Sequence, residues 1–70
     1  MRVFVNNTEI RVFAGATVAD AILSYYGLMH ENTPDPLPPV IDRFGNQVEK
    51  DGSLSPNNRL FIFKPEIPKP

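Results

Sequence analysis

The sequence predicts an α+β domain in which one helix packs across one face of a mixed sheet of four to five strands. Aliphatic and other apolar side chains recur at alternate positions in residues 1–5 and 8–13 with the period of strands, and a pair of asparagines separates the two segments as a tight turn would. Residues 17–26 have helical spacing behind a typical helix start, and alternation returns in residues 59–64. A hairpin followed by one helix and further strands is typical of a helix that covers one side of a sheet.

The N-terminal strands are expected to form a hairpin that turns at Asn6 and Asn7. Asparagine tolerates the positive φ values that a two-residue hairpin turn requires. Strand alternation then brings one set of apolar residues to a single side, which we expect to face the helix. These residues are Val3, Val5, Ile10 and Val12.

The helix is expected over about residues 17–26. Thr17 can accept a hydrogen bond from the amide three residues on, and the carboxylate of Asp20 suits the positive helix end, so the sequence is close to a capping box. Gly27 is well placed as the left-handed residue that ends the helix. The residues at helical spacing that should pack on the sheet are Val18, Ala21, Ile22 and Tyr25.

The segment after the helix cannot continue it, because four prolines occur within residues 33–39. A third strand is expected to begin at Val40, with a turn at residues 44–46 and a short strand at residues 47–49. A further turn is expected at residues 55–58, where a proline pre-sets the required φ.

The last strand alternates Leu60 and Ile62 against Phe61 and Phe63. The first and last strands are the most apolar of the set, so we expect them to be central neighbours in the sheet. Leu60, together with Ile22 of the helix, should then lie in the core.

Length and composition exclude several classes of function. A chain of 70 residues has room for one domain with a modest core. Because there is no cysteine, disulfides, thiolate metal sites, iron–sulfur clusters and cysteine nucleophiles are excluded. The net charge of −1 gives no overall attraction to nucleic acid or anionic membranes. No N-terminal stretch combines a basic start with the apolar run of a signal peptide, and no apolar run approaches the roughly 20 residues of a membrane span. We therefore expect a cytoplasmic protein without a cofactor.

No side chains form a catalytic or metal-binding pattern. The single histidine, His30, has no second ligand or nucleophile nearby in the sequence, so we expect it to be a surface residue. The acidic residues lack the spacing of a metal-binding loop, and no serine has the flanking glycines of a nucleophile elbow. The sequence thus predicts that the protein is not an enzyme.

Three segments resemble the small sulfur-carrier proteins of thiamine and molybdopterin biosynthesis. Residues 2–7 are similar to the opening strand and turn of that family, residues 15–22 to its turn and helix start, and residues 54–62 to its approach to the final strand. The resemblance covers nearly the whole chain and implies the ubiquitin-like β-grasp fold, in which the first and last strands are central neighbours. The glycine and threonine before the helix also occur in TGS domains.

The C-terminal tail departs from that family. The carriers end in Gly-Gly, whose carboxylate is adenylated and converted to a thiocarboxylate in a narrow enzyme channel, whereas this sequence has Lys69-Pro70. We therefore expect a β-grasp domain over residues 1–64 and a proline-rich tail at residues 65–70, acting as a non-catalytic, sulfur-carrier-like protein-interaction or accessory module. The alternatives are a sulfur carrier or ubiquitin-like modifier whose glycine terminus is absent here, and a TGS-like regulatory domain.

Strand alternation also predicts an aromatic face on the side of the sheet away from the helix. On this face, Phe4 and the final-strand phenylalanines should be neighbours across the central strand pair. One helix cannot cover both faces, so these rings are either exposed or covered by something else. Phenylalanine and arginine are favoured at protein interfaces, so we expect a protein partner or self-association. Three alternatives remain open: the proline tail folds over the rings, the twisted sheet hides them in a second small core, or single-stranded RNA stacks on them, which the net charge disfavours. The expected interface residues are Phe4, Phe13, Phe61, Phe63, Arg2, Arg11 and Arg59.

Overall fold

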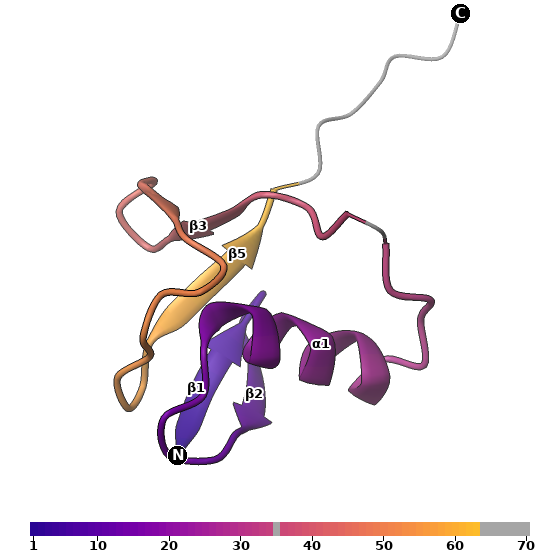
Figure 1. The fold of residues 1–70 in the computed structure, drawn as a ribbon, viewed down its shortest axis with the longest axis horizontal. Coiled ribbons are helices and arrows are strands. Elements are labelled where there is room, and N and C mark those ends of the chain that lie inside the picture. Colours follow the sequence, from indigo (N-terminus) through magenta and orange to yellow (C-terminus); the bar gives the residue numbers. More distant parts are fainter. Residues whose placement is uncertain (35, 64–70) are drawn as a thin grey trace, which may run out of the picture.

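A computed structural model describes residues 1–34 and 36–63 as one helix beside a five-stranded mixed sheet (Figure 1). This confirms the predicted α+β class. The elements, in chain order, are β1 (Arg2–Val5), β2 (Thr8–Arg11), α1 (Val18–Leu28), β3 (Val40–Asp42), β4 (Gln47–Val48) and β5 (Arg59–Ile62).

The strands follow the order β2-β1-β5-β3-β4, so the first and last strands are central neighbours, as predicted. β1 and β5 run parallel, whereas β1 pairs with β2, β5 with β3, and β3 with β4 in antiparallel fashion. The register places Val5 opposite Leu60 and Phe4 opposite Arg59. Paired residues on neighbouring strands point to the same side of the sheet. The apolar pair of Val5 and Leu60 therefore lies on one face, and the pair of Phe4 and Arg59 lies on the other.

The predicted hairpin turn is confirmed. Asn6 and Asn7 have φ values of 51° and 66°, the two positive values of a type I′ turn. The second strand is shorter than predicted: β2 ends at Arg11, although the amide of Val12 still donates to the carbonyl of Met1 at 2.9 Å. Phe13 therefore lies in the loop that leads to α1.

Asn6 joins the hairpin turn to both β5 and the helix. Its amide donates to the carbonyl of Leu60 at 2.9 Å, and its side-chain oxygen accepts from the amide of Ile62 at 3.0 Å. Its side-chain nitrogen lies 3.4 Å from the hydroxyl of Tyr25. A turn residue thus extends the hydrogen bonding between the two central strands and contacts the helix that covers them.

The helix starts as predicted and ends later than predicted. Thr17 and Asp20 form a reciprocal capping box, with the Asp20 amide 3.3 Å from the Thr17 hydroxyl and the Thr17 amide 2.9 Å from the Asp20 carboxylate. The prediction that Gly27 ends the helix is wrong, because α1 continues to Leu28.

The left-handed residue at the helix end is His30, with a φ of 56°. The amide of Glu31 donates to the carbonyl of Tyr26 at 3.0 Å, and the amide of His30 donates to that of Gly27 at 3.2 Å. These are the two hydrogen bonds of a Schellman motif. Gly27 is consequently an exposed residue within the last helical turn.

Two further turns complete the sheet. The carboxylate of Asp42 accepts from the amides of Phe44 and Asn46 at 2.8 and 2.9 Å, which fixes the β3–β4 turn. Before β5, Asn57 has a φ of 67° directly after a proline, as in a type II turn, and this agrees with the predicted turn at residues 55–58.

The core lies between α1 and one face of the sheet. Ile22 and Leu60 are both buried, as predicted, and Ile22 is 0% exposed. Tyr26 is buried as well and packs edge-to-face on Tyr25, with 5.7 Å between ring centroids. The buried residues are Val3, Val5, Ile10, Val12, Ala16, Val18, Ala21, Ile22, Tyr25, Tyr26, Val40, Leu60 and Ile62.

Replacing Ile22 by alanine should lower the free energy of unfolding by about 2–5 kcal/mol, because the cavity left at a fully buried site adds to the lost burial. Leu23→Ala is the matched control, since Leu23 neighbours Ile22 on α1 and is exposed. Urea unfolding of both variants measures the difference. Equal effects would contradict the assignment of the core face.

Replacing Gly27 by alanine should raise the free energy of unfolding by up to about 1 kcal/mol, because glycine is a poor helix former. A Cβ at this position would meet no atom within 4 Å. Gly52→Ala is the opposite control, since a Cβ there would lie 3.0 Å from the carbonyl oxygen of Glu49 and should destabilise. If Gly27→Ala destabilises the protein, the helix does not extend to Leu28.

Candidate functional site

The candidate site is the face of the sheet opposite α1, which we call the open face. Among the described residues α1 is the one helix, and it packs on β1 and β2 from the other side (Figure 1). The registers assign the strand residues of the open face. They are Arg2, Phe4, Glu9, Arg11, Ile41, Gln47, Arg59 and Phe61.

Phe4 lies at the centre of the open face between two arginines. The guanidinium carbon of Arg59 is 4.6 Å from the ring centroid, and that of Arg2 is 5.8 Å from it. The first contact follows from the parallel register, which sets Phe4 opposite Arg59. Cation–π contacts at exposed sites are worth about 0.5–1 kcal/mol each. These two contacts therefore favour a position of the arginines near the ring but add little to the stability of the fold.

The final-strand phenylalanines are not the direct neighbours of Phe4, contrary to the prediction. Phe61 is half-buried and pairs with Ile41 of β3. Phe63 is 50% exposed just beyond β5, where its amide donates to the carbonyl of Pro39 at 2.9 Å. The register of β1 and β5 is the reason, because it shifts Phe61 by two residues from the position opposite Phe4.

Of the predicted interface residues, the structure brings five together on the open face and places two outside the strands. Phe4, Phe61, Arg2, Arg11 and Arg59 belong to the paired strands. Phe63 follows β5, and Phe13 is 65% exposed in the loop before α1.

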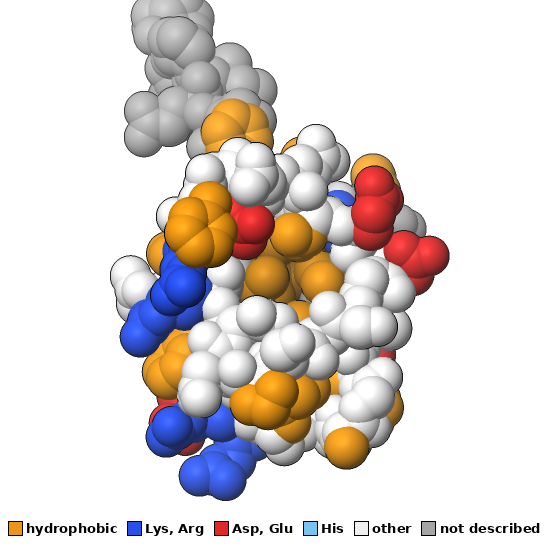
Figure 2. All heavy atoms as spheres, turned by 90° about the vertical axis from the view of Figure 1, so that its left-hand side faces the viewer, with side chains coloured by type: hydrophobic (Ala, Val, Ile, Leu, Met, Phe, Trp, Pro, Cys, Tyr) orange, Lys and Arg blue, Asp and Glu red, His pale blue; other side chains and the backbone are white. Residues whose placement is uncertain are grey.

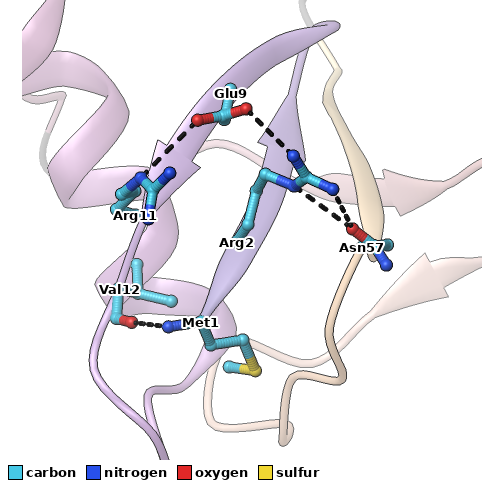
Figure 3. Close-up of polar contacts among 6 residues, drawn as sticks. All are labelled: Met1, Arg2, Glu9, Arg11, Val12 and Asn57. Carbon is cyan, nitrogen blue, oxygen red and sulfur yellow. Dashed lines mark hydrogen bonds and ion pairs between the residues drawn. The ribbon is translucent and has the colours of Figure 1, made fainter.

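The arginines of β1 and β2 share a single carboxylate. Glu9 lies 3.6 Å from Arg2 and 3.6 Å from Arg11, between their two guanidinium groups (Figure 3). Arg2 is held further by the side-chain oxygen of Asn57, at 3.3 and 3.4 Å. These exposed contacts contribute little to stability. They place the Arg2 guanidinium between Glu9 of β2 and Asn57 of the loop before β5.

A pocket of about 360 Å³ adjoins the open face at Arg59. It lies between the β3–β4 turn and the loop before β5. Arg43 and Phe44 line it, with the Arg43 guanidinium carbon 4.8 Å from the Phe44 ring centroid. The complete lining is Asp42, Arg43, Phe44, Pro56, Asn57, Asn58 and Arg59.

Sequence reasoning missed Arg43 and Phe44 because they belong to a turn. Strand alternation carries no information about a turn residue's direction, and the pocket needs two loops that are far apart in the sequence. The available signal in the sequence was an arginine, Arg43, directly followed by an aromatic residue, Phe44, at a predicted turn. Figure 2 faces the side of the molecule on which the β3–β4 turn lies. Along its left margin, basic side chains in blue lie beside hydrophobic ones in orange.

The histidine and acidic side chains of the described residues form no metal-binding group. Within residues 1–34 and 36–63, no three histidine or acidic side chains gather as a metal ion would require. His30 is exposed, while Asp20 and Asp42 accept hydrogen bonds from backbone amides of their own cap and turn. In the same part of the chain, no helix has the length and apolar character to cross a membrane.

No protein-family model, curated protein or solved structure matches the chain.

A double-mutant cycle should detect the contact between Phe4 and Arg59. The coupling free energy from Phe4→Ala and Arg59→Ala is expected to be about 0.5–1 kcal/mol. Phe4 with Arg11 is the control pair, because Arg11 lies opposite Arg2 and should couple less. Urea unfolding of the four proteins in each cycle gives the values, and equal couplings would exclude a specific ring contact.

Proposed function

We propose that the protein is a non-catalytic protein-interaction or accessory module of the ubiquitin-like β-grasp type, similar to the sulfur carriers. The strand order and the parallel pair of first and last strands support the β-grasp assignment. So does the single described helix, which follows the hairpin and packs on one face of the sheet.

The observation that carries the interaction role is the open face itself. Phe4 and Phe61 are only half-buried, although both occupy strand centres where a covered sheet would bury them. Two arginines lie near the Phe4 ring, Arg2 from the same strand and Arg59 from β5. A patch that combines aromatic rings with arginine has the composition of an interface centre, in which a few aromatic and arginine side chains supply most of the binding free energy.

The tail offers a competing explanation. The expected tail at residues 65–70, with its terminal Pro70, lies outside the described residues. Coverage of the rings by the tail depends on these residues, and so does the alternative of a carrier or modifier. If the tail covers the rings, its deletion should destabilise the monomer, whereas an interaction face should lose a partner without losing the fold.

Phe4→Ser and Phe61→Ser test the interaction role. Each should leave a cooperatively folded domain, since a half-buried ring contributes less than the roughly 1.5–3 kcal/mol of a fully buried one. Each should also abolish self-association in sedimentation experiments, or binding of a purified partner identified by cross-linking. Leu23→Ser is the matched control, because Leu23 is an exposed apolar residue on the opposite side.

A loss of stability as large as that of Ile22→Ala would show that the rings are structural. Unchanged binding in both phenylalanine variants would place the interface elsewhere. Deletion of residues 65–70 completes the test: destabilisation by the deletion would support coverage by the tail.

A further inference from the structure

The open face is basic although the whole chain is slightly acidic. Its strand residues include three arginines and one glutamate, namely Arg2, Arg11 and Arg59 against Glu9. The chain's fourth arginine, Arg43, lines the pocket next to Arg59. All four arginines of a net −1 chain therefore lie on the open face or in the adjoining pocket, where Glu9 and Asp42 are the acidic residues.

This charge disfavours a second copy of the protein as the occupant. In a two-fold symmetric dimer, the same patch lies on both sides of the interface. The four arginines of one copy would then approach those of the other, with Glu9 and Asp42 of each copy to offset them. Juxtaposed like charges oppose association, whereas an acidic surface would be attracted.

The aromatic rings disfavour single-stranded nucleic acid. Base stacking requires a free ring face. The Phe4 ring has guanidinium groups at 4.6 and 5.8 Å, so a base could stack on this ring only by displacing the chain's own arginines. Protein side chains require no such stacking, because aliphatic groups can pack on ring edges while carboxylates pair with the arginines.

We propose that the open face and the adjoining pocket bind an acidic segment of another protein that also carries apolar side chains. This inference rests on the proposed interaction function and specifies the partner. Apolar groups of the segment pack on Phe4 and Phe61, and a carboxylate enters the pocket between Arg43 and Arg59. The orienting contacts of Arg2 with Glu9 and Asn57 hold a third guanidinium at the edge of this surface.

The experiment compares three dye-labelled probes by fluorescence anisotropy. The first is a peptide with glutamates around a Phe-Leu pair, the second is the same peptide with lysine for glutamate, and the third is oligouridylate of equal length. The acidic peptide should bind about tenfold more tightly than the lysine peptide, and added salt should reduce this preference.

Charge-reversed variants locate the binding site. Arg43→Glu and Arg59→Glu should each weaken binding of the acidic peptide about fivefold or more. Lys50→Glu is the matched control, because it changes the net charge equally from the loop beside the start of α1. Circular dichroism verifies folding, and Arg43 provides a turn position if Arg59→Glu does not fold.

Three outcomes would overturn the inference. These are equal binding of both peptides, tighter binding of oligouridylate, and equal effects of Lys50→Glu and Arg43→Glu. If Phe4→Ser abolishes partner binding while the charge reversals do not, the acidic partner is wrong and the interaction function stands. If neither kind of change affects binding, both proposals fail.

Discussion

The parallel pairing of β1 with β5 is the constraint on which the rest of the structure depends. It joins the two ends of the described chain in the middle of the sheet. β2 is attached to β1 and β3 to β5, and β4 is attached to β3 at the edge. Asn6 strengthens this junction by bonding to β5 through both its backbone and its side chain. Parallel strands need a long crossover, and here β2, α1, β3 and β4 all lie between the two paired strands in sequence.

The same pairing separates the core from the candidate site. Val5 opposite Leu60 contributes to the core, and the preceding pair, Phe4 opposite Arg59, lies on the open face. A shift of one residue would exchange these roles, since adjacent strand residues point to opposite sides. The same strand register therefore determines both the core contact and the ring–arginine contact, and a change of register would alter both.

The open face combines features that a purely structural surface would not need. A small domain gains stability by burying its largest apolar groups, and here the described core is built from aliphatic side chains and two tyrosines while the phenylalanines remain outside it. The guanidinium groups provide partial cover for Phe4 and keep the surface compatible with water. Such an arrangement suits a surface that must be solvated when free and apolar when bound.

The sequence by itself determined the local features, because each depends on residues close together in the chain. Asn6-Asn7 specified its turn, Thr17 and Asp20 specified the capping box, and alternation assigned the buried faces of β1, β2 and β5. The end of the helix was the exception. Glycine often ends a helix, but here the helix continues past Gly27 and the Schellman hydrogen bonds form with His30 in the left-handed position.

Only the tertiary structure decided which face residues meet. The register of two strands that are more than fifty residues apart set an arginine, and not a phenylalanine, opposite Phe4. The pocket likewise requires the β3–β4 turn and the loop before β5 to come together, and so Arg43 and Phe44 had no visible role beforehand. Periodicity fixes the direction of a side chain relative to its own strand, whereas its neighbours depend on long-range pairing, which local sequence does not encode.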